Sequence, residues 1–160
     1  MNEDTGSSKP LAPRPAARLA AVQALYQMDM AQTDLNAVIA EFVSLRFGDK
    51  AEDATFQDAD QDFFSGIVKG VVRRQREIDP VIDRQLAEGW RLTRIDSILR
   101  AILRAATFEL IERTDVPVRV VINEYVNVAR AFFDGEEPRV VNGVLDKLGR
   151  RYRAAEMGVA

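Results

Sequence analysis

Apolar side chains recur at the 3.6-residue spacing of a helix along most of this 160-residue chain, and no segment alternates convincingly between apolar and polar residues. This periodicity argues against a β-sheet architecture and predicts an all-α fold. The β-branched run at 118–122 is typical of a strand, but the residues after it keep the helical spacing. The expected helices, seven or so, span about 15–30, 34–47, 60–79, 80–88, 93–110, 118–132 and 138–153.

Proline and glycine mark where these helices end. Gly48 is expected to stop the second helix, and a polar loop follows at 48–58. The residue before a proline is disfavoured in the α conformation, so the third helix is predicted to break near Asp79, before Pro80. Thr93 is the expected N-cap of the next long helix. The predicted organisation is a tail at 1–13, one helical domain at 14–153 with sub-bundles at about 14–79 and 80–153, and a tail at 154–160.

The composition argues against catalysis and against bound cofactors. The chain has no histidine and no cysteine, so it lacks the usual zinc, copper and iron ligands and a general base of neutral pKa. The acidic run at 58–62 lacks the glycine and the terminal glutamate of a calcium loop, so no metal site is expected there. Apolar runs are only a few residues long, and no secretion signal is recognisable. We therefore expect a cytoplasmic protein with no cofactor, no metal and no membrane partner.

The last expected helix carries a concentration of positive charge. Residues 139–153 include five basic residues and one acid, although the whole chain has a formal net charge of −3. Charge separated in this way indicates a polyanionic partner. The same helix contains Asn142-Gly143 at its centre, where glycine costs roughly 1 kcal/mol relative to alanine. Such a glycine often permits the close approach of another helix or of a ligand.

Two other basic groups are candidates for phosphate binding. Arg14 and Arg18 are one turn apart at the start of the first helix, where backbone N–H groups also favour an anion. Arg100 and Arg104 are also one turn apart, and they contact either phosphates or acids of neighbouring helices. For all of these positions a solvated face that keeps the protein soluble is the alternative explanation.

Four segments carry a resemblance to a known family. They are ARLAAVQALYQMDM at 17–30, LRAILRAATFEL at 99–110, RTDVPVRVVINEYVNVARAF at 113–132 and PRVVNGVLDKL at 138–148. In order and separation they resemble the NusB family of transcription antitermination factors. The resemblance implies an all-helical fold of two three-helix sub-bundles packed at an angle, in agreement with the periodicity.

The resemblance implies an RNA-binding factor that is not an enzyme. Family members recognise the boxA element of nascent RNA, chiefly in ribosomal RNA operons, together with the ribosomal protein NusE. The complex joins elongating RNA polymerase with other Nus factors and suppresses termination. A protein-only scaffold with little RNA binding is the alternative, and a homodimer stays open. Certain RNA cytosine methyltransferases contain the same helical domain, but the expected cysteine nucleophile and α/β domain are missing from this sequence.

The resemblance also implies an RNA surface with two parts. Carried over by position, the RNA-binding residues are Arg14, Arg18, Gln23, Tyr26, Arg139, Val140, Asn142 and Lys147, with Arg100 and Arg104 as additional phosphate contacts.

Two departures from the family pattern affect this surface. Pro15 and Ala16 interrupt an arginine run that is denser in many members, and Val140 stands where many members carry a phenylalanine. Because stacking of a base on an aromatic ring is worth about 1–3 kcal/mol, the sequence predicts weaker intrinsic RNA affinity and greater dependence on the protein partner.

Overall fold

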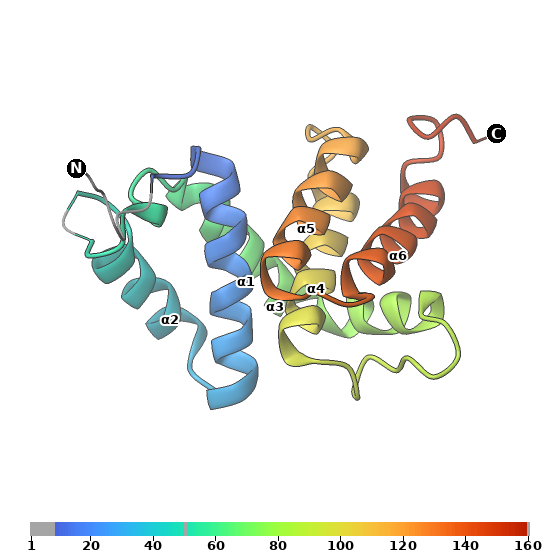
Figure 1. Ribbon diagram of the computed structural model, residues 1–160, viewed down its shortest axis with the longest axis horizontal. Helices are drawn as coiled ribbons and strands as arrows, with labels where there is room; N and C mark the ends of the chain where they lie inside the picture. Colours follow the sequence, from blue (N-terminus) through green and yellow to red (C-terminus); the bar gives the residue numbers. More distant parts are fainter. Residues whose placement is uncertain (1–8, 50, 160) are drawn as a thin grey trace. The chain divides into compact units, whose positions relative to one another are not determined.

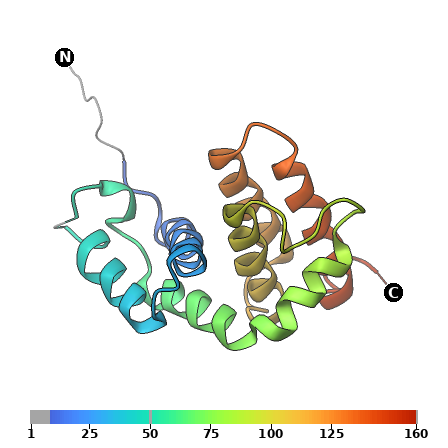
Figure 2. The same ribbon diagram turned by 90° about the horizontal axis from the view of Figure 1, so that it is seen from below.

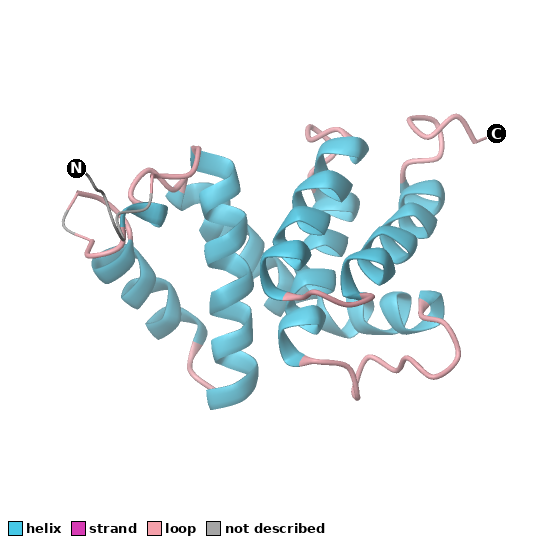
Figure 3. Cartoon of the chain, viewed as in Figure 1, coloured by secondary structure: helices cyan, strands magenta, loops and turns pink. Residues whose placement is uncertain are grey.

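The computed structural model describes residues 9–49 and 51–159, and within these ranges it contains helices and no strand (Figures 1 and 3). The predicted all-α fold is confirmed, with six α-helices in the described ranges. The α-helices are α1 (Pro13–Ala31), α2 (Leu35–Glu41), α3 (Gln61–Gln85), α4 (Ser97–Glu112), α5 (Val118–Phe132) and α6 (Glu137–Tyr152). A π-helical turn, η1 (Phe42–Arg46), continues α2, and a 3₁₀ turn, η2 (Ala54–Phe56), lies in the predicted polar loop.

The chain divides into two compact units between Val68 and Lys69, which lie within α3. The sequence placed the division near Asp79, because it expected α3 to end before Pro80. Instead α3 continues to Gln85, and the separate helix predicted at 80–88 is the last part of α3.

Burial on both sides of Pro80 explains why α3 continues. Proline removes one backbone donor and disfavours the α conformation of the residue before it. However, Ile78 and Ile82 are fully buried, and the Asp79 carboxylate accepts two hydrogen bonds of 2.8 Å from the guanidinium of Arg104 in α4. These contacts hold the backbone of α3 helical through the proline.

The first unit is built on small residues in α1 and on phenylalanine side chains around it. Alanines occupy most buried positions of α1 and allow close packing of α2 and η2 against it: Ala16, Ala17, Ala20, Ala21 and Ala24. Asp34 caps α2 by accepting from the N–H groups of Asn36 and Ala37. Phe64 of α3 contacts the rings of Phe42 and Phe47, with centroids 5.4 and 5.0 Å apart.

Backbone hydrogen bonds attach the predicted polar loop to the start of α1. The N–H of Leu11 donates to the carbonyl of Thr55 at 3.1 Å, and the N–H of Asp60 donates to the carbonyl of Pro13 at 3.0 Å. Gly48 ends the second helical segment with a φ of +87°, as expected from the sequence. Residues 1–8 of the predicted N-terminal tail, and residue 50 of the loop, lie outside the described residues.

In the second unit α4, α5 and α6 pack against one another, and they lie side by side in both ribbon views (Figures 1 and 2). Helix α4 is buried over most of its circumference. Its N-cap is Asp96, which accepts from the N–H groups of Ile98 and Leu99, and not Thr93 as predicted. Both residues can cap a helix, but only Asp96 stands directly before the first buried turn. The hydroxyl of Tyr125 in α5 donates to the buried carboxylate of Glu109 in α4.

Arg153 connects the end of α6 to the turn between α4 and α5. Its buried guanidinium donates to the carbonyl oxygens of Leu110, Val116, Glu109 and Arg113 and pairs with Glu156 at 2.8 Å. The Glu156 carboxylate also accepts from the N–H of Val118 at the start of α5. This hydrogen bond, together with Arg153, lowers the pKa of Glu156 below its ordinary value.

One feature of the predicted C-terminus is therefore corrected. Arg153 is an internal contact and does not belong to the cationic face of α6. Residues 154–159 contain hydrogen-bonded turns, including one from the N–H of Met157 to the carbonyl of Arg153 at 3.0 Å. Residue 160 lies outside the described residues.

Replacement of Leu145 by alanine is expected to lower the free energy of unfolding by about 2–5 kcal/mol, because its side chain is fully buried in the α6 interface. Lys147→Ala, at an exposed position of the same helix, is expected to change it by less than about 0.5 kcal/mol. Urea denaturation followed by circular dichroism measures both values. Similar losses for the two variants would contradict the assigned packing face of α6.

Candidate nucleic-acid interface

The packing of α6 determines which of its side chains face solvent. Val141, Val144, Leu145 and Leu148 form a buried stripe against α4 and α5. Because a helix repeats every 3.6 residues, the polar residues at the complementary spacing lie on the opposite side. These are Arg139, Asn142, Gly143, Asp146, Lys147 and Arg150, and they are named here the α6 polar face.

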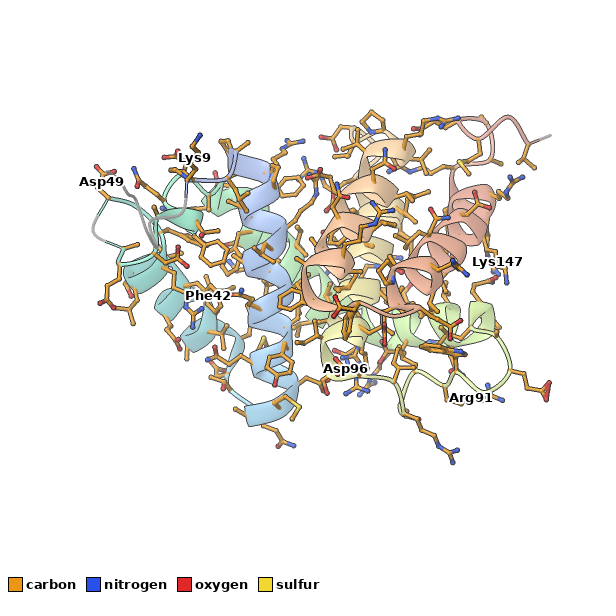
Figure 4. All side chains as sticks on the ribbon, viewed as in Figure 1. Lys9, Phe42, Asp49, Arg91, Asp96 and Lys147 are labelled. Carbon is orange, nitrogen blue, oxygen red and sulfur yellow. The ribbon has the colours of Figure 1, made fainter. Side chains whose placement is uncertain are left out.

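Three side chains of the α6 polar face lack a partner within the described part of the chain. Asp146 accepts a hydrogen bond from Arg150 at 3.0 Å, so these two charges offset each other. The side chains of Arg139, Asn142 and Lys147 form neither a hydrogen bond nor an ion pair with any described residue. Lys147 projects from α6 (Figure 4). The uncompensated charge of this face is therefore positive.

Gly143 is exposed at the centre of the α6 polar face. A Cβ atom built on it would meet no atom within 4 Å, so no neighbouring helix of the described chain requires a glycine there. Packing within the described chain therefore does not account for this glycine, and close approach by a ligand stays a prediction. Gly70 is an example of a glycine that permits close approach of another helix, because a Cβ there would lie 2.1 Å from the Phe108 ring of α4.

A hollow of about 710 Å³ lies beside the start of α6, where α5 and α6 meet. Three amides, two guanidinium groups and one aromatic ring make up most of its lining, which consists of Asn123, Val126, Asn127, Arg130, Phe133, Asp134, Gly135, Pro138, Arg139 and Asn142. Sequence reasoning predicted only Arg139 and Asn142 among these. Asn123, Asn127 and Arg130 lie on one face of α5 at helical spacing. This spacing of polar residues is the feature of the sequence that indicates them.

The start of α1 combines one exposed and one buried arginine. The guanidinium carbons of Arg14 and Arg18 lie 4.5 and 4.9 Å from the centroid of the Phe63 ring, so the two residues share a face as predicted. Arg14 is exposed, whereas Arg18 is only 3% exposed. Arg18 therefore contributes to the packing of its unit, and Arg14 is the more accessible cation.

The other two predicted positions on α1 differ in their environment. The side-chain oxygen of Gln23 accepts a hydrogen bond from Arg46 at 3.2 Å, and Gln23 is half-buried. Tyr26 is 37% exposed and can present its ring to a ligand. On α6, Val140 is half-buried.

Arg100 and Arg104 hold the region around the start of α4. Arg100 donates to the carbonyl oxygens of Leu92 and Ile95 and to the Ser97 hydroxyl. Arg104 forms the two hydrogen bonds to Asp79 described above. Of the two alternatives for Arg104, phosphate binding or pairing with an acid of another helix, the structure shows the pairing. These internal contacts give both arginines a structural role, and their use as phosphate contacts stays a prediction.

The neighbouring basic cluster on α3 is also paired. Arg73 and Arg74 both donate to the Glu112 carboxylate, at 2.9 and 2.8 Å, and Arg74 also contacts Glu77. These hydrogen bonds lower the pKa of both Glu112 and Glu77 and raise the pKa of Arg74. Two basic and two acidic side chains therefore pair with one another, and their charges largely offset.

Neither a metal centre nor a membrane span is found in residues 9–49 and 51–159. No group of three or more acidic side chains there is arranged to hold a metal ion. No helix in those ranges is both long enough and apolar enough to cross a membrane.

The helical fold and the exposed polar face of α6 agree with the family resemblance. The comparison of sequences decides whether the chain belongs to that family. The model of the NusB family matches residues 15–150. The chain belongs to the NusB family. Curated relatives named transcription antitermination protein NusB include one from Bradyrhizobium diazoefficiens, 54% identical over 91% of this chain and 88% of its own length. Another, from Sinorhizobium fredii, is 51% identical over 94% of this chain and 96% of its own length.

Solved structures of NusB proteins have the same fold. T. maritima NusB superimposes with a TM-score of 0.76 at 27% identity, covering 95% of this chain and all of that one. A crystal structure of the antitermination factors NusB and NusE in complex with dsRNA contains a chain with a TM-score of 0.69 and 25% identity, covering 86% of this chain and 96% of that one. The family is one of transcription antitermination factors and not of enzymes.

Substitution of the two helical glycines is expected to have opposite effects on stability. Gly143→Ala is expected to raise the free energy of unfolding by about 0.5–1 kcal/mol, because alanine has the higher helix propensity and its methyl group meets open space. Gly70→Ala is expected to lower it by about 1–3 kcal/mol, because the methyl group would overlap the Phe108 ring. Thermal unfolding of the two variants and the unsubstituted protein gives the comparison. A destabilising Gly143→Ala would mean that the glycine is required by the fold itself.

Proposed function

We propose that this chain is an RNA-binding transcription antitermination factor that recognises boxA RNA together with the ribosomal protein NusE. The complex then joins elongating RNA polymerase with the other Nus factors and supports transcription of ribosomal RNA operons. The protein acts in the cytoplasm and has no catalytic step of its own.

The observation that carries this proposal is the α6 polar face. Arg139 and Lys147 present positive charge in a chain whose formal net charge is −3, and neither has an acidic partner among the described residues. Cationic side chains neutralise phosphates, while an amide such as that of Asn142 hydrogen-bonds a base edge or a 2′-hydroxyl. The exposed Gly143 between them allows an RNA backbone to approach the helix closely.

The structural relative that contains NusB, NusE and dsRNA supports both partners, since a family member of the same fold is bound to them. On the first unit, exposed Arg14 and partly exposed Tyr26 are the positions of α1 that we assign to RNA, with Gln23 beside them. Arg18 supports this surface from a buried position, because its guanidinium and that of Arg14 both lie over the Phe63 ring.

A protein-only scaffold with little RNA binding is the second candidate. The half-buried Val140 favours it, because the phenylalanine of many family members, whose ring could stack on a base, is absent at this position. The two candidates differ in RNA affinity when NusE is present, and the α6 polar face favours the RNA-binding one.

Titration of a labelled boxA RNA at two or more salt concentrations, with and without NusE, tests the proposal. Affinity is expected to fall steeply with salt, because each phosphate contact releases counterions. Arg139→Ala is expected to weaken binding and to reduce the slope of log K against log salt by roughly one, whereas Asn142→Ala should weaken binding with little change of slope.

Arg84→Ala is the charge-matched control, since Arg84 is exposed on α3 and is not part of the proposed surface. It is expected to leave both affinity and slope close to those of the unsubstituted protein. Absence of RNA affinity even with NusE present would exclude the proposal in favour of the protein-only scaffold.

A further inference from the structure

The chain lacks an aromatic residue at position 140, yet an aromatic ring lies close by in the structure. Phe133, at the end of α5, lines the same hollow as Arg139 and Asn142. We propose that Phe133 is the base-stacking residue of this RNA surface, and that the hollow between α5 and α6 holds one unpaired nucleotide. This inference rests on the proposed function and assigns to RNA a part of α5 that sequence reasoning left out.

The backbone at the end of α5 directs Phe133 into the hollow. The helix ends at Phe132, and Phe133 has an extended conformation with φ −133° and ψ 139°, while its N–H still donates to the carbonyl of Ala129. Successive rings therefore take different directions. Phe132 is 38% exposed and does not line the hollow, whereas Phe133 is half-buried within its wall.

The chemistry of the lining matches an unpaired nucleotide. Arg130 and Arg139 supply positive charge for a phosphate, and one acid, Asp134, partly offsets it. The amides of Asn123, Asn127 and Asn142 offer donors and acceptors for the edge of a base or for a 2′-hydroxyl. Unpaired RNA bases are recognised by this combination of an aromatic surface with amide and guanidinium groups.

These polar side chains form few hydrogen bonds with the described residues, so they are available to a ligand. Asn127 accepts one hydrogen bond from Arg130 at 3.3 Å. Asn123, Arg139 and Asn142 have no partner among the described residues. A volume of about 710 Å³ also lies within the range of roughly 300–1,000 Å³ found for small-ligand sites. An acidic peptide would use the arginines but would gain little from the ring, so a nucleotide is the ligand that uses the whole lining.

The test compares variants of two adjacent phenylalanines in titrations with boxA RNA and NusE. Phe133→Ala is expected to weaken binding by about 5- to 150-fold, the equivalent of one lost stacking contact. Phe132→Ala, the matched control, is expected to stay within about twofold of the unsubstituted protein, because its ring lies outside the hollow. Phe133→Tyr keeps an aromatic face and should retain affinity, whereas Phe133→Leu keeps apolar bulk without that face and should bind weakly.

A second readout follows the base itself. With 2-aminopurine placed at one position of the RNA at a time, one position is expected to show fluorescence quenching on binding that disappears in Phe133→Ala and persists in Phe132→Ala. Circular dichroism and thermal unfolding identify any variant that fails to fold, in which case Phe133→Leu carries the comparison.

The possible failures are distinguishable. Full affinity of Phe133→Leu, or equal effects of Phe132→Ala and Phe133→Ala, would overturn the stacking assignment while RNA binding and its dependence on Arg139 remained. If the unsubstituted protein did not bind RNA with NusE, the proposed function and this inference would fail together. Binding of a poly-glutamate peptide that depends on Arg130 and Arg139, in place of RNA, would identify the hollow as a protein-binding site.

Discussion

The buried stripe of α6 is the constraint on which the proposed RNA surface depends. Four apolar side chains of this helix pack against α4 and α5, and their spacing leaves the polar side of the helix no orientation except outward. Arg139, Asn142 and Lys147 are therefore presented by a packed helix rather than by a mobile loop. Binding groups held in this way lose little conformational freedom when a ligand arrives. The buried guanidinium of Arg153, with its carbonyl partners, fixes the other end of the same helix.

Much of the fold and part of the site could be predicted because they follow from local periodicity. The helical spacing of apolar residues indicated the regions of all six described α-helices, and the charge concentration of α6 indicated its polar face. The errors arose where tertiary contacts overrode local preference. Pro80 does not end α3, because buried isoleucines on both sides and the Asp79–Arg104 ion pair hold the helix together. Arg18 is buried although arginine is usually exposed, since its guanidinium lies over the Phe63 ring, and its assignment to RNA stays a prediction.

The hollow beside α6 could not be predicted from one helix alone. The helical spacing of Asn123, Asn127 and Arg130 indicates only a polar face of α5, and the hollow forms because α5 packs beside α6. Phe133 depends on the backbone as well, because its extended conformation and not its sequence position separates it from Phe132. The prediction of weak RNA affinity rested on the interrupted arginine run and on the missing ring at position 140, and it did not consider α5. A ring supplied from α5 offers a different route to the same kind of contact.

The central claim is that RNA binds at the α6 polar face and the adjoining hollow. The most direct measurement is an NMR titration of the ¹⁵N-labelled protein with boxA RNA and unlabelled NusE, following the side-chain amide signals of asparagines. The signals of Asn123, Asn127 and Asn142 are expected to shift or broaden with RNA beyond any change caused by NusE alone. Asn36, exposed on α2, serves as the internal reference and should not respond. RNA binding that leaves the signals of all three asparagines of the hollow unchanged would show that RNA binds elsewhere.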